Sequence, residues 1–220
     1  MNGKMIFKFA AVTAAIVCVA SASVYASTVA VGSDDTNMLA LANGTLVPVG
    51  GQVQLGTFSI LDAQILALEN NPLTLQADFT AFGSGVIGQG TVDGTHPLGY
   101  AGAFTITMNN VGPAFAASPI YMMVFDTASA ATATQVAVIK GIQTTAGAWI
   151  FPANPVSGAT VIDMDDAIYP PVVGGFISST PSEFAGGNVS AIELHLVPEP
   201  SSVVLVVTGL LGLLGLRRRS

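Results

Sequence analysis

The sequence predicts a mainly β protein, with a single antiparallel β-sandwich or jelly-roll-like domain that includes one short helix. Two observations support this fold class. Several short segments alternate apolar with polar residues, which is the pattern of strands with one buried face, and glycine-rich or proline-rich joints such as 83–85 and 170–171 separate them. The domain is expected to span residues 27–196, between two terminal segments of different composition.

The alternation is clearest in three segments, residues 73–81, 100–108 and 190–196, each of which is predicted to be a half-buried strand. Residues 120–126 are apolar on both faces, and this pattern predicts a central strand. Weaker strand candidates are 52–58, 86–92, 135–142 and 149–151.

One segment, residues 59–70, has apolar residues at helical spacing. Ser59 and Asp62 resemble a capping box at its start, and Asn71-Pro72 is expected to end it. The stripe expected to face the core consists of Leu61, Ile65 and Leu68.

Composition excludes two broad classes of protein. The 220 residues are 51% hydrophobic and 9% charged with a net charge of −7, whereas a disordered chain combines low hydrophobicity with high charge. Of the six Lys and Arg residues, Lys140 is the only one between the terminal segments, so no basic patch for nucleic acid exists there. The single cysteine, Cys18, is close to the N-terminus, and the domain therefore has no disulfide and no thiolate metal site.

Residues 1–26 have the layout of a secretory signal peptide, with two early lysines, an apolar run over 9–20 and small residues before Ser27. We expect the Sec export machinery to recognise this segment, and we expect cleavage between Ala26 and Ser27. An uncleaved N-terminal anchor is the alternative, but the apolar run is shorter than the roughly 20 residues that a membrane span needs.

Three elements follow the domain in order: an extended tripeptide, an apolar span and a basic stop. The span over residues 201–216 would form about 24 Å of helix against a hydrocarbon core of about 30 Å, which predicts a short transmembrane helix. Prolines keep the tripeptide out of that helix, and the basic stop keeps the C-terminus in the cytoplasm. The tripeptide is Pro198, Glu199 and Pro200, and the membrane stop is Arg217, Arg218 and Arg219.

Together these three elements, over residues 197–220, resemble the PEP-CTERM sorting signal of Gram-negative bacteria. The resemblance implies that the chain is a substrate of an exosortase, a membrane-embedded cysteine protease-transpeptidase found in species that make extracellular polysaccharide, flocs or biofilm. It also implies transient anchoring in the inner membrane, followed by delivery to the cell surface or the extracellular space. A permanently tail-anchored envelope protein remains the alternative.

The exported body offers few groups for chemistry, and no catalytic residue is assigned. His96 lies in a turn sequence and His195 on the predicted last strand, where it is expected to face solvent. A weak candidate for Ca²⁺ is the acidic cluster of Asp163, Asp165 and Asp166, because hard oxygen ligands in a loop can hold this ion. A solvated acidic loop explains the same residues, and no cofactor is otherwise expected.

Two functions therefore remain open. The first is a non-catalytic protein of the cell surface or extracellular matrix, whose hydroxyl and amide side chains meet extracellular polysaccharide. The second is an exported carboxylate-dependent hydrolase, which would need a cleft that gathers several acidic residues. The carboxylates available for such a cleft are Asp78, Asp126, Asp163, Glu183 and Glu193.

Overall fold

The computed structural model describes residues 27–33, 37–92, 96–97, 99–109, 111–141, 148–154, 159–164, 170–182 and 185–198. In these residues the chain is mainly β, which confirms the predicted class. Two short helices are present where one was predicted.

The largest sheet has five strands, and all of its neighbouring strands are antiparallel. Its order is β13 (His195–Leu196), β9 (Gln135–Lys140), β8 (Tyr121–Phe125), β3 (Gln52–Phe58) and β4 (Phe79–Val86). The two helices follow β3 in the chain, and they are α1 (Asp62–Ala67) and α2 (Pro72–Ala77).

Two three-stranded sheets and one small hairpin complete the fold. One sheet has the order β10 (Ala159–Asp163), β1 (Thr28–Gly32) and β7 (Thr105–Asn109). The other has the order β11 (Gly175–Ser182), β12 (Gly187–Glu193) and β2 (Asn37–Ala40). The hairpin consists of β5 (Thr91–Val92) and β6 (His96–Pro97). Because β1 runs parallel to β10 and β12 parallel to β2, the predicted antiparallel architecture holds only in part.

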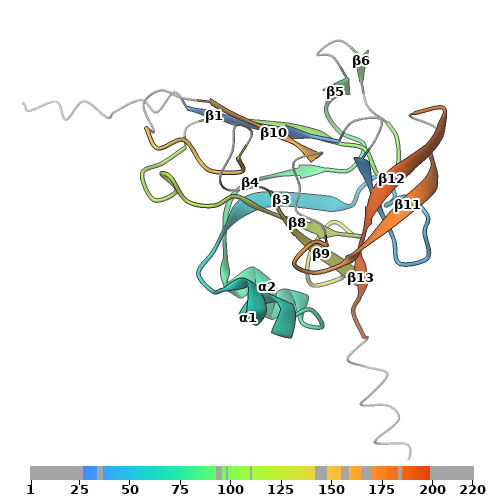
Figure 1. Cartoon of the computed structure of the whole chain (residues 1–220), viewed down its shortest axis with the longest axis horizontal. Coiled ribbons are helices and arrows are strands. Elements are labelled where there is room, and N and C mark those ends of the chain that lie inside the picture. Colours follow the sequence, from blue (N-terminus) through green and yellow to red (C-terminus); the bar gives the residue numbers. More distant parts are fainter. Residues whose placement is uncertain are drawn as a thin grey trace, which may run out of the picture.

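The five-stranded sheet lies in the middle of the molecule, with β1 and β10 beyond one face and the helical pair α1–α2 beyond the other (Figure 1). Strand β8 is central in this sheet, as predicted, and its side chains alternate between two hydrophobic clusters. Met122 and Val124 join the cluster that includes Val29 of β1, whereas Met123 and Phe125 join the helix-side cluster. The helix-side cluster also contains Phe58, Ile65, Leu75, Phe79, Val136 and Val138.

The prediction of a strand over residues 73–81 was wrong for its first half, which forms α2. Asn71 caps this helix, because its side chain accepts a hydrogen bond from the backbone N–H of Thr74 at 3.1 Å. Pro72 occupies the first turn, where its missing N–H costs nothing and its fixed φ suits a helix. The first helix already ends at Ala67, so Asn71-Pro72, predicted to end it, instead starts the second.

The predicted helix over 59–70 is present, but it is shorter and capped differently. The side chain of Gln64 accepts a hydrogen bond from the backbone N–H of Leu61 at 3.0 Å, so the cap begins at Leu61. Ser59 instead hydrogen-bonds the carbonyl of Asp78, at the start of β4. Within the expected apolar stripe Ile65 is fully buried, whereas Leu61 is 75% exposed.

Four other predicted strands are shortened or divided. In 100–108 only Thr105 onward is a strand, because Gly102 adopts a positive φ of 72° in a turn. The segment 190–196 is divided between β12, which pairs with β11 and β2, and β13, which pairs with β9 of the five-stranded sheet. The candidate at 149–151 forms a single bridge from Ile150, and 86–92 contributes only the end of β4 and β5.

A polar cluster of Asp62, Tyr121 and Lys140 joins α1 to β8 and β9. Lys140 forms an ion pair with Asp62, and the Tyr121 hydroxyl donates to the same carboxylate at 2.8 Å. Burial acts to raise the pKa of Asp62, but the hydrogen bonds from Lys140 and Tyr121 and the charge of Lys140 together lower it below 3.8. Burial, followed by the hydrogen bond and the charge of Asp62, raises the pKa of Tyr121 well above its usual range.

The first prediction is that this cluster makes stability depend on acid. A carboxyl whose pKa is lowered in the folded state stabilises the fold above its unfolded pKa of about 3.8, and this contribution is lost as the pH falls. The wild-type segment should lose unfolding free energy as the pH falls from about 5 to about 2. We expect Asp62→Asn and Lys140→Met each to show a smaller loss over the same range. The effect should be modest, because the Asp62 side chain is 39% exposed and solvent screens the pair.

Denaturant unfolding of the segment Ser27–Val197, which contains every described helix and strand, measures this dependence. Variants that retain the full wild-type pH dependence would contradict the prediction.

The second prediction concerns the cap of α2. Removing an N-cap side chain costs about 1 kcal/mol, and we therefore expect Asn71→Ala to lower the unfolding free energy of the same segment by that amount. The matched control is Asn188→Ala, which removes a hydrogen bond between the exposed side chains of Asn188 and Ser179 and should cost less than about 0.5 kcal/mol. Equal losses in the two variants would show that the cap has no special role.

Candidate functional site

The C-terminal tail leaves the body directly from its last strand. His195 and Leu196 pair with Val136 and Gln135 of β9, and the N–H of Val197 donates to the carbonyl of Thr134 at 2.8 Å. Val197 also packs against the helix-side cluster, whereas Pro198 is exposed. The folded body therefore ends one residue before the predicted sorting tripeptide, with no intervening linker.

Most of the residues predicted for export and sorting lie outside the described part of the chain. Among them are Ala26, Glu199, Pro200, the span over 201–216 and the arginines at 217–219. In the part that the structure describes, no helix is long and apolar enough to cross a membrane. Ser27, the expected first residue after cleavage, is fully buried next to the start of β1.

The acidic residues proposed for a hydrolytic cleft are not all brought together. Asp78 precedes β4 at the Phe58 end of β3, and Asp126 follows β8 at the Gln52 end. Six steps along β3 separate these ends, a distance of about 20 Å. The carboxylate of Asp126 accepts hydrogen bonds from the backbone N–H groups of Thr134 and Gln135, which closes the connection between β8 and β9.

One predicted carboxylate and one predicted histidine do share a hollow. Glu193 and His195 line a cavity of about 410 Å³ beside the tail exit, together with Ala42, Gly174, Gly175, Leu194 and Leu196. A ring nitrogen of His195 lies 3.2 Å from the side-chain oxygen of Asn70. None of the residues that line this cavity carries a hydroxyl or thiol.

The predicted Ca²⁺ ligands are only partly within the described residues. The backbone of Asp163 pairs with Gly32 at the end of β10, whereas Asp165 and Asp166 lie outside the described residues, as does Glu183. Across the described ranges, no three His, Cys, Asp or Glu residues form a group that could hold a metal ion. His96, predicted in a turn, belongs to the two-residue strand β6.

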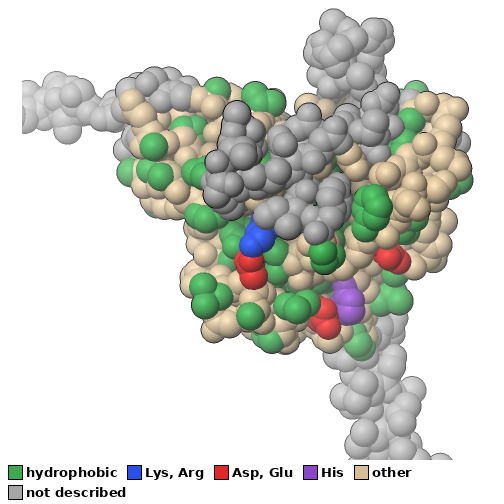
Figure 2. Space-filling view, in the orientation of Figure 1, with side chains coloured by type: hydrophobic (Ala, Val, Ile, Leu, Met, Phe, Trp, Pro, Cys, Tyr) green, Lys and Arg blue, Asp and Glu red, His purple; other side chains and the backbone are tan. Residues whose placement is uncertain are grey.

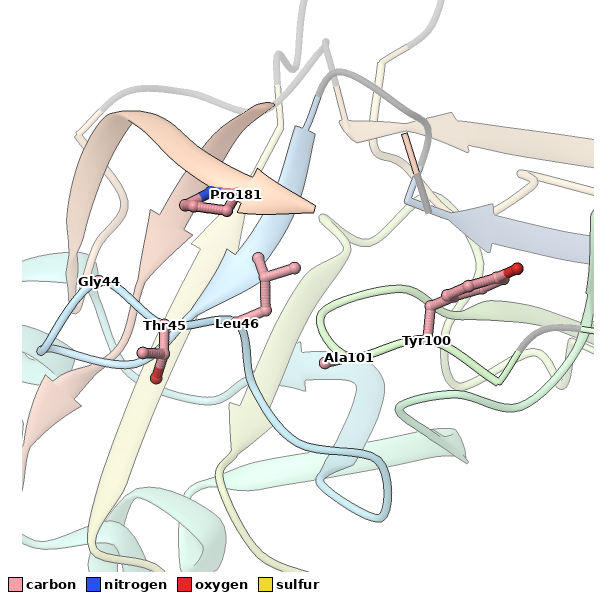
Figure 3. A pocket seen from close by; sticks show the side chains of 6 residues that line it. All are labelled: Gly44, Thr45, Leu46, Tyr100, Ala101 and Pro181. Atoms are coloured by element: carbon pink, nitrogen blue, oxygen red, sulfur yellow. The ribbon is translucent and has the colours of Figure 1, made fainter. Parts of the chain in front are cut away.

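A second hollow, of about 260 Å³, was not predicted from the sequence (Figure 3). Three segments that are distant in the chain line it: residues 44–46 after β2, residues 100–101 before β7, and Pro181 of β11. The ring of Tyr100 is 40% exposed, and Thr45 hydrogen-bonds Asn43 at 2.7 Å. The sequence offers only a weak hint of this hollow, a tyrosine at position 100. The three segments that line the hollow are brought together by the tertiary fold, which no local pattern predicts.

Comparison with known proteins bears on the tail. A search of curated proteins and a search of solved structures found no match to the chain. Residues 196–219 match the family model described as the PEP-CTERM protein-sorting motif. The motif implies an exported protein that an exosortase-type system processes and sorts to the cell envelope or surface. The β-rich body is thus joined, at Leu196, to this motif, and the chain is a PEP-CTERM motif-containing protein.

Proposed function

We propose that this chain is a non-catalytic protein of the cell surface or extracellular matrix, associated with extracellular polysaccharide. Its N-terminal signal peptide directs it through the Sec machinery, and its C-terminal helix anchors it transiently in the inner membrane. An exosortase-type protease then releases the body at the tripeptide of Pro198, Glu199 and Pro200.

The observation that carries the proposal is the direct join between the folded body and the sorting motif. The backbone hydrogen bond of Val197 and its packing in the helix-side cluster secure the chain up to the residue before Pro198. Pro198 is exposed, and proline also restricts the residue before it to an extended conformation. A protease at the membrane would therefore find an accessible, extended segment outside a domain that is already complete.

Two features of the body support a binding role over a hydrolytic one. Asp78 and Asp126, two of the candidate acids, lie at opposite ends of β3. The lining of the hollow at Tyr100 instead includes an aromatic residue and a threonine. An aromatic face packs against the C–H face of a sugar ring while hydroxyl groups hydrogen-bond its edge, so this hollow is the proposed polysaccharide contact.

The third prediction tests the sorting reaction. Changing Pro198 and Pro200 to alanine allows the tripeptide to join the following helix, because alanine is the best helix former. In a host that contains the matching exosortase, we expect the wild-type body to be released and the double variant to remain full length in the inner membrane. The apparent mass and the membrane fractionation of an epitope-tagged body measure this outcome.

The matched control changes two exposed prolines of the body, Pro48→Ala with Pro113→Ala, and it should be processed like wild type. If the wild-type chain itself stays full length in the membrane, the protein is a permanently tail-anchored envelope protein and the sorting proposal fails.

The fourth prediction tests the polysaccharide contact. Tyr100→Ala removes the exposed ring, and we expect the affinity for extracellular polysaccharide isolated from the producing strain to fall about fivefold, equivalent to about 1 kcal/mol. Affinity electrophoresis in gels containing that polysaccharide gives the two dissociation constants. Phe176→Ala is the control, because Phe176 is a similarly exposed aromatic residue on β11, outside the hollow. An equal loss in both variants, or none in either, would overturn the assignment of the contact to Tyr100.

A further inference from the structure

We propose that the end of the body from which the tail leaves rests on a zwitterionic phospholipid surface while the chain is anchored. The contact is made by a leucine patch, which we define as Leu61, Leu66, Leu73 and Leu196. This inference depends on the anchored state of the proposed function, and it adds a docking surface on the body itself.

The first observation is exposure. The exposed fractions of Leu61, Leu66, Leu73 and Leu196 are 75%, 50%, 57% and 60%. These four leucines are half of the eight exposed large hydrophobic residues in the described part of the chain, and the other four lie on other elements. In the space-filling view, hydrophobic side chains are spread over the end of the molecule that contains the helical pair and β13 (Figure 2). Single exposed leucines are ordinary, but these four belong to elements that lie at one end of the molecule (Figure 1).

The second observation is that packing holds the helical pair against the tail exit. His195 of β13 contacts Asn70, which lies in the connection between α1 and α2. Val197 packs in the same cluster as Ile65 of α1 and Leu75 of α2. Ile65 and Leu75 are thus buried against the sheet, whereas the leucines at 61, 66 and 73 are exposed. The helical pair and β13 lie at the same end of the molecule (Figure 1).

The third observation is the length of chain between this end and the predicted span. Only three residues, 198–200, separate Val197 from the first residue of the span, and four steps of extended chain reach at most about 14 Å. The interfacial layer on each side of the hydrocarbon core is several Å thick. With residues 201–216 in the membrane, the end of the body at Leu196 and Val197 therefore lies at or very near the lipid headgroups, and the helical pair lies at this end (Figure 1).

The chemistry of this end favours a particular kind of lipid surface. Apolar side chains enter the headgroup layer of a membrane. The short tether keeps the leucine patch at a high effective concentration near the lipid, so that even a weak contact is occupied. Around the patch, Lys140 is paired with Asp62, while Glu69 and Asp78 add negative charge. Anionic headgroups would be repelled by these carboxylates, so the patch suits a zwitterionic phospholipid.

The experiment measures lipid contact at one residue of the patch. The chain is purified from the membranes of a host without exosortase, with Cys18→Ser, and placed in nanodiscs of phosphatidylcholine. A nitroxide is attached at Leu73→Cys or, as the control, at Val161→Cys, a 71% exposed apolar position on β10 away from the tail exit. Power-saturation spectroscopy then compares collisions with oxygen, which concentrates in lipid, and with an aqueous nickel chelate.

We expect the ratio of oxygen to chelate collisions at residue 73 to be several times that at residue 161, and to fall toward the control when phosphatidylglycerol replaces much of the phosphatidylcholine. Equal ratios at the two positions, in chains that have entered the nanodiscs, would overturn the docking surface but leave the anchor intact. The docking surface would also be overturned if the label at residue 73 were shielded from the aqueous chelate only after the exosortase is added. The patch would then be a contact for the protease. Failure of the chain to enter nanodiscs would refute the anchor and the docking surface together.

Discussion

Burial of β8 and β9 on both of their faces is the constraint on which the rest of the structure depends. Successive residues of these strands enter opposite clusters, as Met122 and Met123 do, so each face of the sheet needs its own cover. The sheet of β1, β7 and β10 covers one face and the helical pair covers the other. Because the body contains no cysteine, this double burial replaces the disulfides that many exported domains use.

The central strands were predictable because their signal is local. A run such as 120–126, apolar on both faces and short for a helix, favours a strand covered on both sides, and the structure places β8 there. The error at 73–77 has an equally local cause. A helix of six residues buries only Pro72 and Leu75, and over so short a length this spacing cannot be distinguished from alternation. The parallel pairing of β1 with β10 could not be predicted from the sequence of either strand, because tertiary packing sets the pairing of strands that are distant in the chain.

The sorting motif and the surface hollows also differed in how far the sequence predicted them. The sorting motif is a linear signal, so the order of its tripeptide, span and basic stop could be read directly from residues 197–220. The hollow at Tyr100 and the surroundings of His195 depend on segments from distant parts of the chain. His195 was expected to face solvent, yet its partner is Asn70, a residue that sequence reasoning assigned to the end of a helix. The linear motif therefore identified how the chain is sorted, whereas the residues that meet on its surface could be identified only from the fold.

The place of β1 in its sheet has a consequence for the order of folding during export. This strand begins one residue after the expected cleavage site, yet it is the middle strand of its sheet, pairing with β7 and with β10. Thr28 pairs with Ala159, so on the proposed export route this strand cannot complete its sheet until more than half of the chain has followed it. Such long-range pairing slows folding, because the entropy of closing a long loop is lost before the stabilising contacts between the strands form. On the proposed export route, the body would therefore close its core late, after most of the chain has crossed the membrane.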